Sequence, residues 1–312
     1  MRNTNRRRAL VASLAALSLV LGACGGAEDA APEEEAPLAL DLEQPAAPAP
    51  DEAPAEAPAE FDLAAAVDVY VSTIPAGFMT AGNVEAFKEA LAVPGTVLID
   101  VRELAEIEGG VIPGAVHIPI REIPDNLDAI PTDRPVIVYC ASGWRAGLTV
   151  SSLRMMGYDN VVAFTPSWAG WTAAGEPAGE PVAAESFGEP VGLTPEIVDA
   201  AGDFLATLPA GFLTNSLDAV QDAIAAGAGL VDVREPEEYE EGFIEDAISI
   251  PIRQLVAQID EVPTDRSVIV YCLSGYRASL SLPILHVLGR TNSQGFPGSF
   301  NAWVDAGLAT SS

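Results

Sequence analysis

Short apolar runs rich in β-branched residues alternate along the chain with longer segments of helical length. The runs that predict buried strands in the first half of the chain are 96–100 (TVLID), 135–139 (PVIVY) and 160–164 (NVVAF). Residues 146–156 have the length and apolar spacing of a helix, and Gly157 follows as its stop. Residues 83–91 predict a further helix ahead of the first strand. Strands separated by helices predict an α/β fold, in which a mostly parallel central sheet is flanked by helices.

The same pattern occurs twice in the chain, and matching segments of the two copies are separated by a constant number of residues. The segments that recur are 98–103 (LIDVRE) as 230–235 (LVDVRE), 136–140 (VIVYC) as 268–272 (VIVYC), and Trp171 as Trp303. A period this long indicates two whole domains rather than a solenoid. We therefore expect one domain over residues 61–180 and a second over 190–312, with the boundary in the Gly- and Pro-rich stretch 175–192.

The N-terminal part of the chain, before the first domain, has a different composition. Four arginines precede an uncharged apolar run over 9–21, which is too short to span a membrane comfortably but suits a signal peptide. The run ends in Leu-Gly-Ala-Cys, which resembles a bacterial lipobox, so we expect a signal peptide over 1–23 and lipid attachment at Cys24. Residues 24–60 are rich in Ala, Pro, Asp and Glu and contain no Lys or Arg, as expected of a disordered acidic tether. The protein would then be exported and lipid-anchored, facing the extracytoplasmic side of a bacterial membrane.

The charge balance excludes one class of partner. The chain has 15 Lys and Arg against 45 Asp and Glu, a formal net charge of −30. Because nucleic acids are bound chiefly through Lys and Arg on phosphates, we expect no nucleic-acid partner. Three cysteines and two histidines exclude a disulfide-rich scaffold and argue against a metal site, and no cofactor is expected.

The candidate chemistry lies in two copies of one loop, each between a strand and a helix. The loops are Cys140-Ala141-Ser142-Gly143-Trp144-Arg145 and Cys272-Leu273-Ser274-Gly275-Tyr276-Arg277. Backbone N–H groups at a helix N-terminus favour negative charge, so they would stabilise a thiolate there. Glycine lets the loop take unusual backbone angles. The arginine at the end of each loop adds a cation whose planar fork suits oxyanions.

This Cys-x-Ser-Gly-x-Arg loop resembles the active-site loop of the rhodanese (sulfurtransferase) family. The Asp-Val-Arg-Glu strand ends and the segment 112–119 (IPGAVHIP) resemble that family too. The resemblance implies two rhodanese-like domains. It also implies that Cys140 and Cys272 take sulfane sulfur from a small anionic donor such as thiosulfate. The persulfide would be held by the loop amides and passed to cyanide or a thiol.

Several rival functions fit the loops less well. Cysteine-dependent phosphatases have five residues between Cys and Arg, whereas both loops here have four, a ring better sized for a single sulfur. A Cys–His mechanism would need a histidine in each repeat, yet His117 corresponds to Ser249 and His286 to Arg154. Two alternatives stay open: a non-catalytic binding or sensing module with the rhodanese fold, and a thiol–disulfide relay between the two loop cysteines.

Other residues are expected to have structural roles. The strand-end charges that we expect to form ion pairs are Asp100, Arg102, Asp232 and Arg234, and the aromatics expected to pack in the core are Trp168, Trp171 and Trp303. His117 is expected to be structural, and Trp144 and Tyr276 could line the mouth of a pocket. The second repeat departs from the family pattern over 242–249. Its loop helix contains Pro283, which we expect to kink or end that helix.

Overall fold

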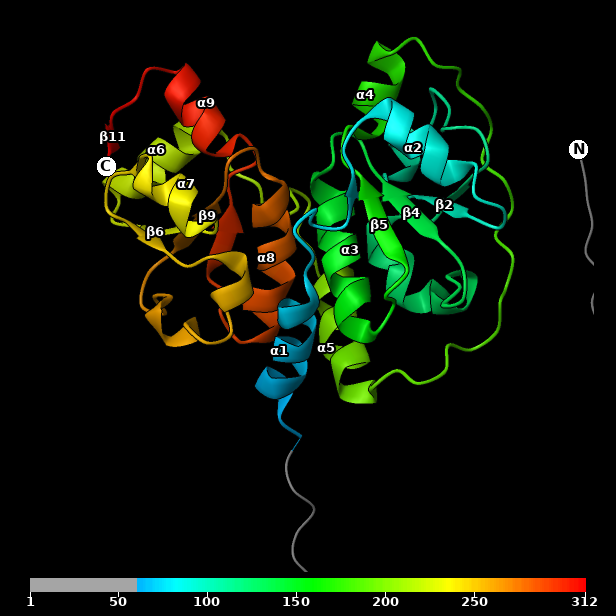
Figure 1. Ribbon diagram of the computed structural model, residues 1–312, viewed down its shortest axis with the longest axis horizontal. Helices are drawn as coiled ribbons and strands as arrows, with labels where there is room; N and C mark the ends of the chain where they lie inside the picture. The colour runs from blue at the N-terminus through cyan, green and yellow to red at the C-terminus, as the bar shows by residue number, and fades with distance from the viewer. Residues whose placement is uncertain (1–60) are drawn as a thin grey trace, which may run out of the picture. The chain divides into compact units, whose positions relative to one another are not determined.

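The computed structural model describes residues 61–312, and the fold of this part follows the repeat (Figure 1). The expected signal peptide, Cys24 and the acidic tether lie outside the described residues. Among the helices of 61–312, none is long and apolar enough to cross a membrane.

The first repeat contains the following elements in chain order: α1 (Leu63–Thr73), β1 (Thr80–Ala81), α2 (Val84–Leu91), β2 (Val97–Asp100), the 3₁₀ helix η1 (Leu104–Glu106), β3 (Ala115–His117), the 3₁₀ helix η2 (Ile120–Ala129), β4 (Val136–Tyr139), α3 (Trp144–Met156), β5 (Val161–Phe164) and α4 (Ser167–Ala173).

The second repeat contains α5 (Pro195–Ala206), α6 (Leu217–Ala225), β6 (Gly229–Asp232), α7 (Pro236–Glu240), β7 (Phe243–Ile244), β8 (Ala247–Ser249), the 3₁₀ helices η3 (Ile252–Gln254) and η4 (Ile259–Glu261), β9 (Val268–Tyr271), α8 (Tyr276–Val287), β10 (Ser293–Gly295), α9 (Ser299–Asp305) and β11 (Thr310–Ser311).

Each repeat is built around its own parallel sheet. The strand order is β1-β5-β4-β2-β3 in the first repeat and β10-β9-β6-β8 in the second, and every pairing in these two sheets is parallel. The register repeats as well, because Leu98 pairs with Ile137 and Leu230 pairs with Ile269. The α/β fold class is therefore confirmed.

The predicted elements of the first repeat are confirmed to within two residues at their ends. Asn83 caps α2, since its side chain accepts a hydrogen bond from the backbone N–H of Ala86 at 2.8 Å. Helix α3 begins two residues before the predicted start and ends at Met156, and the Gly157 that follows has a left-handed φ of 113°. A left-handed residue after the last turn is a common helix stop, and glycine adopts that conformation without steric cost.

Pro283 does not end the helix of the second loop. Helix α8 runs through it from Tyr276 to Val287. Proline removes one backbone hydrogen bond, but most helix stability in proteins comes from tertiary packing. Helix α8 packs against α3 and α5, and Pro283 itself is buried. Of the two expected effects, a kink or an end of the helix, the second is wrong, because packing outweighs the lost bond.

The two repeats share one apolar core. Helices α3 and α8, which follow the two cysteine loops, pack side by side at its centre (Figure 1). Ser151 on α3 donates a hydrogen bond to the carbonyl of Leu280 on α8 at 2.7 Å, and Tyr70 on α1 donates to Ser151 at 3.1 Å. The helices that follow both loops are therefore packed together in one core.

The segment that opens each repeat packs against the other repeat. We call residues 63–79 the first arm and residues 195–213 the second arm. Helix α5 of the second arm packs against η2 and α3 of the first repeat, and α1 of the first arm contacts η3 of the second. Each arm thus lies in one repeat by sequence and contacts the other repeat in space.

Candidate active site

Each loop cysteine lies directly after a central strand and is contacted by a backbone amide of its own loop. The N–H of Gly143 donates to Sγ of Cys140 at 3.2 Å, and the N–H of Gly275 donates to Sγ of Cys272 at 3.1 Å. Both cysteines are free thiols, and each is 1% exposed. Both cysteines therefore lie where the sequence predicts them, at the carboxyl end of a parallel strand and beside the N-terminus of a helix.

Glycine is required at the third position after each cysteine. Gly143 and Gly275 have φ values of 98° and 99°, in the left-handed region. A Cβ on Gly143 would lie 2.5 Å from the carbonyl oxygen of Thr165, and one on Gly275 would lie 2.3 Å from that of Pro297. No side chain fits at either position, which keeps the turn closed over the sulfur.

A buried serine braces each cysteine, and the sequence interpretation missed both. The N–H of Cys140 donates to Oγ of Ser167 at 3.1 Å, and that hydroxyl donates to the carbonyl of Phe164 at 2.8 Å. Ser299 makes the same bond to the N–H of Cys272 at 3.1 Å. The two serines occupy corresponding positions of the repeat, so the constant offset was the signal that could have found them.

The loop arginines are paired with carboxylates rather than free. Nη2 of Arg145 donates to Oε1 of Glu106 at 2.6 Å, and Nη2 of Arg277 donates to Oε1 of Glu238 at 2.7 Å. Each pair is bidentate, because the second nitrogen of each guanidinium bonds the other carboxylate oxygen. Hydrogen bonding to the arginine holds the pKa of each glutamate below its usual value. The arginine at the end of each loop is therefore the expected cation, but Glu106 and Glu238 neutralise its charge.

Burial and the facing carboxylate have opposite effects on these arginines. Burial alone would lower the pKa of Arg145 and of Arg277, but the hydrogen bond to the paired glutamate, together with the charge interactions with the loop cysteine and that glutamate, outweighs it. The pKa of each guanidinium is therefore raised, and both side chains stay charged. Glu106 and Glu238 also occupy corresponding positions of the repeat, a signal that the sequence interpretation did not use.

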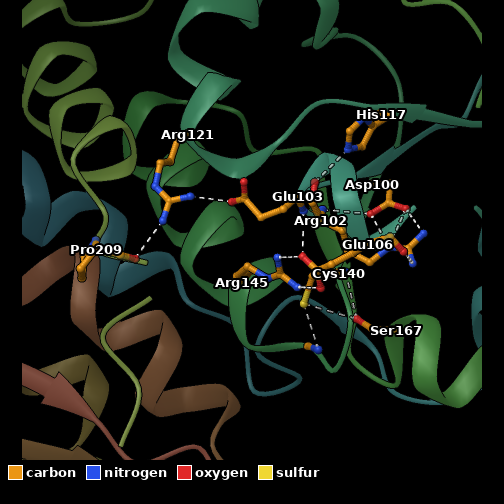
Figure 2. A network of polar contacts seen from close by, with 11 residues as sticks. Asp100, Arg102, Glu103, Glu106, His117, Arg121, Cys140, Arg145, Ser167 and Pro209 are labelled. Atoms are coloured by element: carbon orange, nitrogen blue, oxygen red, sulfur yellow. Dashed lines mark hydrogen bonds and ion pairs between the residues drawn. The ribbon is translucent and has the colours of Figure 1, made fainter. Parts of the chain in front are cut away.

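The strand-end charges form the expected buried ion pair in both repeats. Nη2 of Arg102 donates to Oδ2 of Asp100 at 2.6 Å, and Arg234 makes the same bond to Asp232 at 2.7 Å. His117 contributes to this region of the first repeat, since its Nε2 lies 2.8 Å from the carbonyl oxygen of Arg102. Figure 2 shows this network beside Cys140, Arg145 and Glu106.

Of the remaining predicted loop residues, some stabilise the loop through backbone hydrogen bonds and others line a cavity. Ala141 and Leu273 brace the loop through their carbonyls, which accept from the N–H groups of Ala169 at 2.9 Å and Asn301 at 3.0 Å. The loop residues that line a cavity of about 840 Å³ are Ser142, Gly143, Trp144, Cys272, Ser274, Gly275, Tyr276 and Arg277. This cavity therefore receives wall residues from both loops. Cys140 is not among the residues that line it.

Trp144 and Tyr276 also connect each loop to the arm of the other repeat. Nε1 of Trp144 donates to the carbonyl of Phe212 at 2.9 Å, and the hydroxyl of Tyr276 donates to the carbonyl of Met79 at 3.1 Å. Trp171 and Trp303 are buried in the cores as expected. Trp168 is half-buried, and its ring lies 4.5 Å from the guanidinium carbon of Arg102.

Two arginines hold the arms in place next to the loops. Arg121 on η2 donates to the carbonyls of Leu208 and Pro209 at 2.8 and 2.9 Å. It also pairs with Glu103, and Figure 2 shows its contacts with Pro209 and Glu103. In the second repeat, Arg253 makes the equivalent contacts with the first arm and with Glu235. These arm contacts were not predicted.

The chain matches a known protein family in both repeats. The family model described as the rhodanese-like domain matches residues 83–174 and 216–306, one stretch in each repeat. The chain is 35% identical over 94 residues to a sulfurtransferase from Allochromatium vinosum, a match that covers 30% of this chain and 88% of that protein. It is 30% identical over 95 residues to a thiosulfate:glutathione sulfurtransferase from Saccharomyces cerevisiae, a match that covers 26% of this chain and 68% of that protein.

Among solved structures, the chain is similar to a thiosulfate sulfurtransferase from Pseudomonas aeruginosa. The two are 24% identical, and the match covers 77% of this chain and 47% of that chain with a TM-score of 0.35. The two sequence relatives align with less than a third of this chain, a length comparable to one repeat.

Proposed function

The chain belongs to the family of proteins with rhodanese-like domains, and from this membership we propose that it transfers sulfane sulfur through a cysteine persulfide. The family and its sulfurtransferase relatives support sulfur transfer in general. The donor is a small anion such as thiosulfate, and the acceptor is a thiol or cyanide. The name of the similar protein from Saccharomyces cerevisiae supports thiosulfate as the donor and a thiol as the acceptor.

The reaction needs two displacements at sulfur. In the first, the cysteine thiolate attacks the outer sulfur of thiosulfate, the sulfur–sulfur bond breaks, and its electron pair leaves with sulfite. In the second, the acceptor attacks the terminal sulfur of the persulfide, and the electron pair of the breaking bond returns to the cysteine. The products are sulfite and either thiocyanate or an organic persulfide, and there is no net oxidation of the protein.

The observation that carries the proposal is the amide contact at each sulfur. The N–H groups of Gly143 and Gly275 lie 3.2 and 3.1 Å from Sγ, so they favour negative charge on the nucleophile and on the persulfide that it forms. A buried serine fixes the backbone of each cysteine. With these donors in place, activation requires no histidine at either site.

The test is a cysteine series assayed with thiosulfate and cyanide. Wild type, Cys140→Ser, Cys272→Ser and the double variant are compared for thiocyanate formation and for the mass increase of one sulfur atom per chain. We expect at least one single variant to retain both signals and the double variant to lose both. If wild type shows neither activity nor persulfide with several sulfur donors, the chain is instead a binding or sensing module. Finding a Cys140–Cys272 bridge by non-reducing peptide mapping would favour a disulfide relay.

We also propose that the protein is exported and lipid-anchored through Cys24, on the strength of the basic, apolar and Leu-Gly-Ala-Cys order of the N-terminal residues. Incorporation of a labelled fatty acid in a bacterial host is expected for wild type and not for Cys24→Ala. Equal labelling of the two proteins would contradict the anchor.

A further inference from the structure

The cavity beside Cys272 is much larger than the smallest acceptor requires. Its volume is about 840 Å³, within the ~300–1,000 Å³ typical of pockets for small organic molecules. A single water takes about 30 Å³ of liquid, and cyanide has only two heavy atoms. Because Cys272 lines this space, an acceptor several times larger than cyanide would fit beside it.

Part of the cavity wall comes from the first repeat, including Phe78 of the first arm and Trp144 of the first loop. The ring of Phe78 is half-buried, and its centroid lies 5.3 Å from the guanidinium carbon of Arg277 and 4.7 Å from that of Arg253. Such cation–π contacts hold the ring in place. The bond from Tyr276 to the carbonyl of Met79 fixes the backbone next to it.

The chemistry of the wall gives an organic molecule contacts that a two-atom anion such as cyanide is too small to use. Arg277 is bound by Glu238, and the other carboxylate on the wall, Glu235, is bound by Arg253. With these charges paired, the wall presents aromatic rings and the hydroxyls of Thr80 and other residues. Aromatic and hydroxyl groups in combination are what small-molecule sites use for contact area and orientation.

We propose that Phe78 is a specificity-determining residue of the Cys272 site, where it forms the wall that receives an organic thiol of about tripeptide size. This inference rests on the sulfur-transfer function proposed above. The acceptor thiolate attacks the terminal sulfur of the Cys272 persulfide, and the sulfur–sulfur bond breaks with return of its electron pair to Cys272. An organic persulfide leaves the cavity, and the proton lost by the acceptor thiol passes to solvent. The first repeat thereby selects the acceptor for a cysteine of the second.

The equivalent aromatic residue of the other site provides a matched control. Phe212 of the second arm stacks on Arg145 and Arg121, with guanidinium distances of 4.8 and 4.6 Å, yet it does not line this cavity. Replacing it removes the same kind of stacking from the first repeat. The control therefore shows whether losing an arm aromatic that lies outside the cavity is enough to disturb turnover at Cys272.

The experiment uses the full chain carrying Cys140→Ser, so that turnover passes through Cys272. With thiosulfate as donor, kcat/KM is measured for glutathione and for cyanide before and after Phe78→Ala. We expect the value for glutathione to fall about tenfold, the order of effect for lost contact in an apolar pocket. The value for cyanide should change less than about twofold, and Phe212→Ala should leave both values unchanged within about twofold.

The outcomes separate this inference from the proposed function. An equal loss of kcat/KM for both acceptors would mean that Phe78 merely supports Arg277. An unchanged kcat/KM for glutathione would show that Phe78 does not contact the acceptor. Either result overturns the inference. Absence of a Cys272 persulfide by mass spectrometry, before any acceptor is added, overturns transfer at Cys272 itself. If Phe78→Ala fails to fold by circular dichroism, Phe78→Leu and Phe78→Trp replace it. A selective loss or gain with glutathione then supports the inference, and equal changes for the two acceptors overturn it.

Discussion

The two cysteine loops share almost all of their hydrogen bonds but differ in the side chains around them. The amide-to-sulfur distances are 3.2 and 3.1 Å, and the cysteine-to-serine distances are both 3.1 Å. Around this common geometry, Trp144 corresponds to Tyr276, and Cys272 but not Cys140 lines the large cavity. Backbone amides, glycine and a buried serine hold the sulfur in both loops. Side chains that face outward can therefore differ without disturbing it.

The buried arginines at the strand ends differ more between the two repeats than the loops do, because they make different numbers of hydrogen bonds to backbone carbonyls. Arg102 bonds Asp100 and also donates to the carbonyls of Glu106 at 3.0 Å and Gly110 at 2.8 Å. Among the described residues, Arg234 has one such backbone acceptor, the carbonyl of Gly242 at 2.7 Å. The arginine of the second repeat therefore depends more on its aspartate.

The largest expected effect comes from breaking these buried pairs. Asp232→Ala leaves the guanidinium of Arg234 buried with one acceptor, and removing one partner of a buried pair typically costs about 3–5 kcal/mol. We expect Asp100→Ala to cost less, because Arg102 keeps two carbonyl acceptors. Unfolding in guanidinium chloride, followed by circular dichroism, measures the free energy of unfolding of both variants.

Asp133→Ala is the control for this prediction, since it breaks an exposed ion pair with Arg134, and exposed pairs contribute little to stability. It should leave the unfolding free energy unchanged within error. Equal losses for Asp100→Ala and Asp232→Ala would show that the extra carbonyls of the first repeat have no energetic weight.

The strands and loops could be predicted because their local signals are strong. A run rich in β-branched residues such as 135–139 fits a buried strand, and Gly143 occupies a backbone conformation that a side chain would block. The braces at Ser167 and Glu106 were missed although the repeat offset contained them. Polar residues of these types also occur throughout exposed surfaces, so residue type alone did not set them apart.

The crossing of the arms could not be predicted from the sequence. A helix such as α5 presents an apolar face, but that pattern does not say which of two similar repeats will cover it. Because the two repeats offer similar surfaces, the choice is seen only in three dimensions, where α5 packs against η2 and α3 of the first repeat. The cavity at Cys272 takes wall residues from both repeats, so the place of Phe78 beside it could not be predicted from the sequence.

The smallest expected effect concerns a position where the repeats use different residues for the same bond. Nε of Arg154 donates to the carbonyl of Val161 at 2.9 Å, and Nε2 of His286 lies 2.8 Å from the carbonyl oxygen of Ser293. Since a carbonyl can only accept, Nε2 of His286 carries the hydrogen. Burial lowers the pKa of His286 below its ordinary value of 6.5, and the bond to Ser293 opposes this shift.

A histidine whose pKa is lowered on folding contributes stability at pH values above its pKa in the unfolded chain. That stability is lost as the pH falls through its pKa in the folded protein. We expect the unfolding free energy to decrease as the pH is lowered from 6.5 towards 5, and His286→Arg, which installs the residue of the first repeat, to reduce that slope. The effect is small because protonated His286 keeps its bond to Ser293. His117→Ser, which likewise installs the residue of the other repeat, controls for loss of a histidine. Denaturant unfolding at several pH values measures the slopes, and identical slopes for wild type and His286→Arg would show that the two repeats do not differ in pH response at this position.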